Sequence, residues 1–150
     1  LNGYDEAILL DSNGLVSEGT GENIFIVKDG KLVTPPPTAS ILNGITRDTV
    51  IKLASEMRVQ VVERNIARAE LYTCDEAFFT GTAVEIMPIL TIDKRQIGDG
   101  EMGALTGRIK AFFSEVTSGN VEKYSSWLTP VYATLVKEAR SDPAIATLSS

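Results

Sequence analysis

The sequence contains no histidine and only one cysteine, Cys74. Without histidine, a Ser–His–Asp triad, a Cys–His pair and the usual zinc sites each lack a necessary member. A single cysteine cannot form an intrachain disulfide, which fits the reducing cytosol, and it supplies no metal-ligand cluster. No apolar run approaches the roughly 20 residues that span a bilayer, and no signal-peptide pattern opens the chain. We therefore expect a cytoplasmic protein that is neither a metalloenzyme nor a membrane protein.

Positive charge is also scarce, because the net charge is −6 and the sequence pI is about 4.7. No basic run interleaved with aromatic residues is present, so binding to nucleic acid is not expected. A small anion is still a possible ligand, since backbone N–H groups bind anions locally. The 150 residues, 43% of them hydrophobic, are enough to bury one sizeable core.

The clearest local element is a β-hairpin over residues 24–34. Two apolar runs flank Asp29-Gly30, and Asp-Gly supplies the positive φ angles of a tight hairpin turn. A second hairpin is expected over residues 7–18, around the turn signal at residues 12–14. Three prolines at positions 35–37 end the strand and predict an extended segment.

Helices and further strands are mixed irregularly after the prolines. Apolar residues at helical spacing predict an amphipathic helix that opens at residues 46–48, with Thr46 as its N-cap. The other expected elements are strands over residues 59–62, 76–79 and 86–92, and helices over 68–73, 104–116 and 131–140. This irregular order favours an α+β fold over a regular βαβ array.

Three segments could carry chemistry, and each also has an ordinary structural interpretation. Residues 43–48 place a glycine and a hydroxyl before a helix start, which is a competent phosphate seat or simply a capped helix. Residues 79–83 place two threonines around a glycine after an apolar strand, which is either an anion seat or a strand-end turn. Residues 17–25 hold two acids, one of which could keep a ring nitrogen protonated, or they form a solvated loop.

Taken together, three motifs in this order resemble the class IV pyridoxal-phosphate aminotransferases, and most closely the branched-chain amino-acid enzymes. They are GYDEAILLDSNGLVSEGTGENIFIVKDG, LVTPPPTASILNGITRD and DEAFFTGTAVEIMPI. The similarity runs from Gly3 to about Val131. It implies the mixed-sheet, pseudo-barrel large domain of the fold type IV, D-amino-acid-aminotransferase-like enzymes. We expect residues 1–131 to form this cofactor-binding domain and residues 132–150 an extension without an assigned role.

The resemblance implies that the cofactor is pyridoxal 5′-phosphate, and it gives two residues a role at the cofactor ring. Glu18 matches the acid that pairs with the pyridine nitrogen. An anion there keeps the ring protonated, so that the ring acts as an electron sink. Leu42 matches the apolar side chain that packs on the ring face.

The resemblance also assigns the anion-binding residues. Gly44, Ile45 and Thr46 match the helix start that holds the cofactor phosphate, and Thr82 matches a further phosphate contact. The backbone N–H groups of Thr82 and Ala83 match those that receive the substrate carboxylate. The implied substrates are branched-chain amino acids (leucine, isoleucine and valine) and 2-oxoglutarate with its product glutamate. The implied parent protein is a homo-oligomer.

One element of the family pattern has no counterpart in this sequence. In the family, the lysine that binds the cofactor covalently lies ahead of the segment that matches residues 3–6, and here the chain begins with Leu1 rather than methionine. We therefore expect a fragment without a catalytic residue of its own, inactive in isolation. The open alternatives are a D-amino-acid aminotransferase or an aminodeoxychorismate lyase of the same fold, or a non-catalytic fragment that binds a phosphate ligand.

Overall fold

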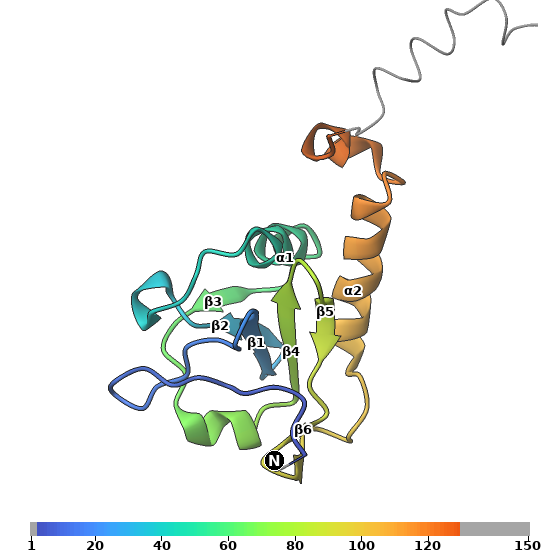
Figure 1. Cartoon of the computed structure of the whole chain (residues 1–150). Coiled ribbons are helices and arrows are strands. Elements are labelled where there is room, and N and C mark those ends of the chain that lie inside the picture. The colour runs from blue at the N-terminus through green and yellow to red at the C-terminus, as the bar shows by residue number, and fades with distance from the viewer. Residues whose placement is uncertain (1–2, 130–150) are drawn as a thin grey trace, which may run out of the picture. The chain divides into compact units, whose positions relative to one another are not determined.

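The computed structural model describes residues 3–129, and its centre is a five-stranded mixed sheet (Figure 1). The strand order is β3-β2-β1-β4-β5. Strands β2 and β3 pair in parallel, and the other neighbours pair antiparallel. The strands are β1 (Asn23–Lys28), β2 (Lys31–Thr34), β3 (Val61–Glu63), β4 (Glu76–Gly81) and β5 (Glu85–Pro88). This mixed sheet with flanking helices confirms the α+β prediction.

Helices and a small hairpin complete the described chain. The two α-helices are α1 (Ile45–Glu56) and α2 (Ala104–Thr117), and the 3-10 helices are η1 (Pro37–Ala39), η2 (Arg68–Tyr72) and η3 (Glu122–Trp127). Strands β6 (Thr91–Ile92) and β7 (Arg95–Gln96) form a separate two-stranded sheet. Within the part of the chain that the structure describes, no helix is long and apolar enough to cross a membrane, and no three acidic, cysteine or histidine side chains gather as metal ligands.

The core is built on strands whose two faces are both buried. β1 and β4 alternate between the faces, with Ile24, Ile26 and Phe79 on one face and Phe25 and Phe78 on the other. All five side chains are at most 7% exposed. The two phenylalanines, which are directly paired across β1 and β4, stack with ring centroids 5.1 Å apart. A sheet covered on both sides needs nearly continuous apolar strands, which explains the run from Ile24 to Val27.

Both predicted hairpins are present. Asp29 and Gly30 have φ angles of 50° and 70° and join β1 to β2, as the Asp-Gly pattern requires. The earlier hairpin is reduced to one antiparallel bridge between Leu10 and Val16 with flanking hydrogen bonds, one of them from Leu9 N–H to the Glu18 carbonyl at 2.8 Å. This second contact fixes the backbone of Glu18.

Several predicted boundaries were wrong. The expected strand over residues 86–92 is two short strands, β5 and β6, and Pro37 begins the 3-10 helix η1 instead of extending the chain. Proline suits the first position of a helix, because its fixed φ matches and its missing N–H is not needed there. Contacts divide the chain into two compact units, residues 1–114 and 115–150. The division at residue 131 stays a prediction, and the expected helix over residues 131–140 lies outside the described residues.

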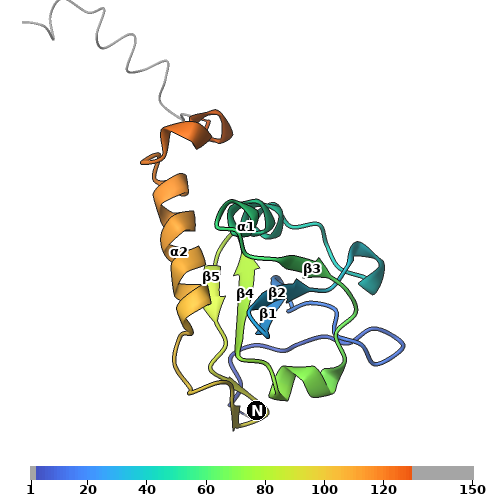
Figure 2. The same ribbon diagram turned by 180° about the vertical axis from the view of Figure 1, so that it is seen from behind.

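The start of α1 differs from the prediction in a way that matters for the site. Gly44, with φ −70° and ψ 135°, is the N-cap, and no side chain caps the helix. Thr46 is already the second helical residue, so the prediction of Thr46 as N-cap was wrong. An N-cap needs an extended backbone, which Gly44 has and a helical Thr46 does not. Figure 2 shows this helix start, seen from behind, beside the end of β4.

Candidate active site

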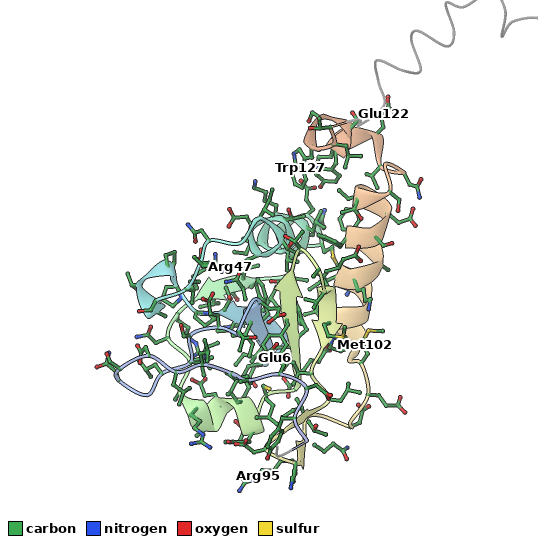
Figure 3. All side chains as sticks on the ribbon, viewed as in Figure 1. Glu6, Arg47, Arg95, Met102, Glu122 and Trp127 are labelled. Carbon is green, nitrogen blue, oxygen red and sulfur yellow. The ribbon has the colours of Figure 1, made fainter. Side chains whose placement is uncertain are left out.

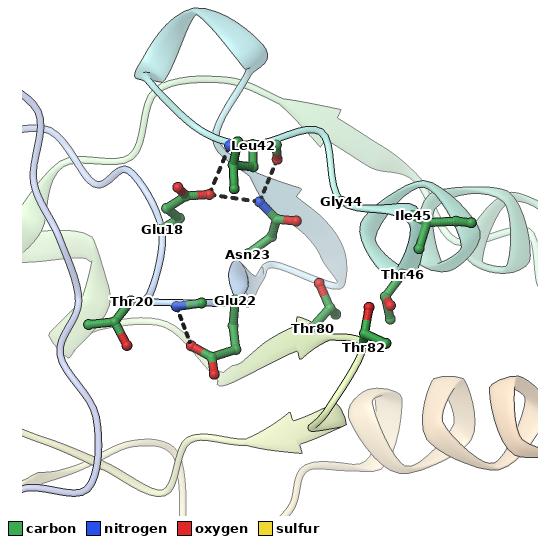
Figure 4. A pocket seen from close by; sticks show the side chains of 12 residues that line it. Glu18, Thr20, Glu22, Asn23, Leu42, Gly44, Ile45, Thr46, Thr80 and Thr82 are labelled. Atoms are coloured by element: carbon green, nitrogen blue, oxygen red, sulfur yellow. Dashed lines mark hydrogen bonds between the residues drawn. The ribbon is translucent and has the colours of Figure 1, made fainter.

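One open cavity of about 110 Å³ lies where β1 begins, β4 ends and α1 begins. Its lining contains six of the seven residues that the sequence singled out. They are Glu18, Leu42, Gly44, Ile45, Thr46 and Thr82. Figure 4 shows Glu18 on one side of this space and Thr46 and Thr82 on the other. The seventh residue, Ala83, is exposed and follows Thr82 directly without lining the cavity.

Three backbone donors are available at the start of α1. The first hydrogen bond of the helix runs from Asp48 N–H to the Gly44 carbonyl, at 3.0 Å. The preceding N–H groups of residues 45–47 therefore have no acceptor within residues 3–129. Unpaired amides at the positive end of a 12-residue helix attract an anion. The threonine hydroxyls beside them add further donors, so this side of the cavity is suited to a phosphate.

The opposite side of the cavity presents an acid that is held in place. One oxygen of Glu18, Oε2, accepts hydrogen bonds from Leu42 N–H at 3.0 Å and from Asn23 Nδ2 at 3.1 Å. The carboxylate is partly buried, and its backbone is fixed by the hairpin contact with Leu9. A carboxylate in this position can pair with a protonated ring nitrogen.

The mouth of the cavity is apolar and open. The side chains of Leu42 and Ile45 are each 76% exposed, although both line the cavity. Exposed leucine and isoleucine side chains at a cavity mouth can cover the face of a planar ring or contact another part of the protein.

No lysine or arginine is among the residues that line the cavity. Arg47, one residue beyond the helix start, is 2% exposed (Figure 3). Its guanidinium binds Glu63 at 2.6 Å and the Pro35 carbonyl at 3.0 Å. Arg47 thus ties α1 to β3 and is not directed to the cavity, so within residues 3–129 an anion here depends on amide and hydroxyl donors.

Sequence reasoning named the segments of some lining residues without giving those residues a role. Asn23 and Thr80 are paired across β1 and β4 and are 5% and 1% exposed. The Thr80 hydroxyl has no hydrogen-bond partner among the described residues. Glu22 shapes the loop before β1, since its Oε2 accepts the Gly21 N–H at 3.0 Å. A polar residue at the buried start or end of an apolar strand was the available signal for Asn23 and Thr80.

Residues 1–92 match the family described as "Amino-transferase class IV". The chain belongs to this family. It is 55% identical over 133 residues to a probable branched-chain-amino-acid aminotransferase of Aquifex aeolicus, and these residues cover 88% of the chain and 43% of that relative. This class IV chain thus spans less than half the length of the curated relative it matches.

Solved structures agree with the fold of this class IV chain. The branched-chain aminotransferase of Thermoproteus uzoniensis with norvaline matches with a TM-score of 0.83 and 52% identity, over 87% of this chain and 43% of that one. The enzyme of Thermobaculum terrenum in its PLP form matches with a TM-score of 0.84 and 47% identity, over 87% and 43%. These neighbours confirm the fold type IV prediction.

Proposed function

We propose that this chain is the cofactor-binding part of a pyridoxal-phosphate-dependent branched-chain amino-acid aminotransferase. The parent protein would transfer the amino group between leucine, isoleucine or valine and 2-oxoglutarate. The observation that carries this proposal is a cavity that places a fixed carboxylate opposite unpaired helix amides, in a class IV chain about 50% identical to enzymes so named.

The two sides of the cavity have separate roles. The amides of Ile45 and Thr46 and the hydroxyls of Thr46 and Thr82 bind the phosphate, and Gly44 begins the helix without a side chain in their way. Glu18 binds the ring nitrogen and keeps its proton. The 76% exposed side chain of Leu42 covers one face of the ring.

The bound cofactor supplies an electron-withdrawing ring that stabilises negative charge at the substrate α-carbon. Thr82 N–H and Ala83 N–H orient the substrate carboxylate at the far edge of the site. No lysine lines the cavity within residues 3–129. We therefore propose that the covalent lysine and a phosphate-binding arginine come from the rest of the parent protein, and that the isolated chain is inactive.

The charge on Glu18 gives the decisive test of cofactor binding. A hydrogen bond to a charged group contributes about 1.5–3 kcal/mol, so losing it entirely would cost roughly 10–100-fold in affinity. We expect Glu18→Gln to weaken binding of pyridoxamine 5′-phosphate to the chain by this factor, measured by equilibrium dialysis. Glu85→Gln, at an exposed position of β5, is the matched control and is expected to bind normally.

The reaction itself is tested on the parent protein. Leucine with 2-oxoglutarate should turn over faster than D-alanine with 2-oxoglutarate, and the 150-residue chain alone should turn over neither. A parent that prefers D-alanine would indicate a D-amino-acid aminotransferase, and one that releases pyruvate from aminodeoxychorismate would indicate the lyase. Tight cofactor binding with none of these activities would favour a non-catalytic phosphate-binding fragment. Cell fractionation would test the expected cytoplasmic location, and sedimentation the expected homo-oligomer.

A further inference from the structure

Asn23 joins the acid of the proposed site to the loop that leads into α1. Its Nδ2 donates to Glu18 Oε2 at 3.1 Å and to the Leu42 carbonyl at 2.8 Å. Leu42 N–H donates to the same oxygen of Glu18 at 3.0 Å. Figure 4 draws these three hydrogen bonds, which link Glu18, Asn23 and Leu42 in a closed ring. Leu42 lies 19 positions after Asn23 and 24 positions after Glu18 in the chain.

The other end of the Asn23 amide is enclosed as well. A Cβ atom added at Gly44 would lie 2.2 Å from Asn23 Oδ1, far inside van der Waals contact. The side chain is only 5% exposed. A buried amide confined on both ends keeps one orientation, so its contact with Glu18 is fixed in direction.

The two oxygens of the Glu18 carboxylate differ in the hydrogen bonds that they accept. Oε2 accepts both donors described above, whereas Oε1 accepts none from residues 3–129. A carboxylate with one oxygen bound twice loses its freedom to rotate, so the Glu18 carboxylate keeps one orientation beside the cavity. The residue touches the cavity through the same side chain.

We propose that Asn23 is a positioning residue that holds Glu18 Oε2 and so fixes the orientation of the carboxylate that binds a protonated ring nitrogen. This inference rests on the function proposed above, because it gives Glu18 the same ligand. Asn23 also lines the cavity, and in this proposal it acts through its hydrogen bond to Glu18. A purely structural asparagine would stabilise the loop without affecting how Glu18 binds a ring.

The first test needs no ligand, because the Leu42 amide reports whether Glu18 is held. Asn23→Leu keeps a similar volume and removes the donor to Glu18. We expect amide hydrogen exchange at Leu42 to become at least fivefold faster in this variant, while exchange in β1 and β4 is unchanged. Asn120→Leu is the matched control, because Asn120 Nδ2 makes an exposed hydrogen bond of the same 3.1 Å length to Glu115 Oε2. Unchanged exchange at Leu42 in Asn23→Leu would overturn the proposal.

The second test asks whether Asn23 acts through Glu18. Dissociation constants for pyridoxamine 5′-phosphate are measured for the unsubstituted chain, Asn23→Leu, Glu18→Gln and the double variant. We expect Asn23→Leu to weaken binding about tenfold when Glu18 is present but less than twofold when Glu18 is already glutamine. The effects of substitutions in one hydrogen-bond network are not additive. Asn23→Asp should bind more weakly still, because it places a second carboxylate beside the first. Inorganic phosphate, used as a competitor, should bind equally well to all five proteins.

The outcomes separate this inference from the proposed function. Additive effects of the two substitutions, or normal binding by Asn23→Leu, would reduce Asn23 to a structural residue and refute the proposal alone. If Glu18→Gln binds pyridoxamine 5′-phosphate as tightly as the unsubstituted chain does, Glu18 does not bind the ring nitrogen. The proposed function and this inference then fail together.

Discussion

The carboxylate of Glu76, in β4, caps the start of α2, and removing it gives the sharpest test of how the fold is held. Its two oxygens accept Leu105 N–H at 3.0 Å, Thr106 N–H at 2.7 Å and the Thr106 hydroxyl at 2.6 Å. A Cβ atom at Gly103 would lie 2.0 Å from the Glu76 carboxyl carbon, so only glycine permits this approach. Thr106 is 1% exposed, so its N–H and hydroxyl depend on Glu76 for an acceptor in the folded chain.

The expected loss of stability follows from these contacts. A buried donor left without an acceptor costs about 1–3 kcal/mol, a lost helix cap costs about 1 kcal/mol, and a lost charge at the helix N-terminus costs about 0.3–1 kcal/mol. These contributions overlap, so we expect Glu76→Ala to lower the free energy of unfolding by about 3 kcal/mol. Glu76→Gln keeps one acceptor oxygen and should lose about half as much. Both are large fractions of a typical total of about 5–15 kcal/mol.

The assay is equilibrium unfolding in urea, followed by circular dichroism, with Glu101→Ala as the control. Glu101 is exposed in the loop before α2, and its removal should change stability by less than about 0.5 kcal/mol. If the free energies of unfolding of Glu76→Ala and Glu101→Ala differ by less than about 0.5 kcal/mol, Glu76 does not stabilise the start of α2 and the reasoning is wrong.

Two further predictions concern ionisable groups away from the cavity. The hydrogen bond from Arg64 lowers the pKa of Glu70, and Ala67 N–H and nearby positive charge make smaller contributions. The Arg64–Glu70 pair therefore stabilises the fold above the ordinary glutamate pKa of about 4.3. This stabilisation is lost as the pH falls through the lowered pKa of Glu70. The difference in melting temperature between the unsubstituted chain and Arg64→Gln should therefore be constant from pH 7 to pH 5 and shrink below about pH 4. A difference that widens below about pH 4 would contradict this account. Burial raises the pKa of the Cys74 thiol to about 11, so iodoacetamide at pH 8 should react at least tenfold more slowly with the folded chain than with the urea-unfolded chain, and equal rates would show that the thiol is accessible.

The proposed site shows why local patterns reached only part of the answer. The sequence motifs named Glu18, Leu42 and Thr46 by resemblance, and the fold brings them to one cavity. They did not assign a role to Asn23, whose side chain connects Glu18 to Leu42. A hydrogen bond between segments so far apart in the chain leaves no periodic signal, because it depends on where β1 places its first residue.

The sequence alone determined the elements whose causes are local. Asp29-Gly30 required the β1–β2 hairpin through its positive φ angles, and the helical spacing of apolar residues required α1 and α2. Tertiary structure alone decided which residue caps each of these helices. Glu76 reaches the start of α2 from a strand almost 30 residues earlier, and the N-cap of α1 is Gly44, where the Asn23 amide leaves no room for a side chain. Hydrogen bonds and close contacts between distant segments form only after the sheet has brought those segments together, so their partners cannot be read from neighbouring residues.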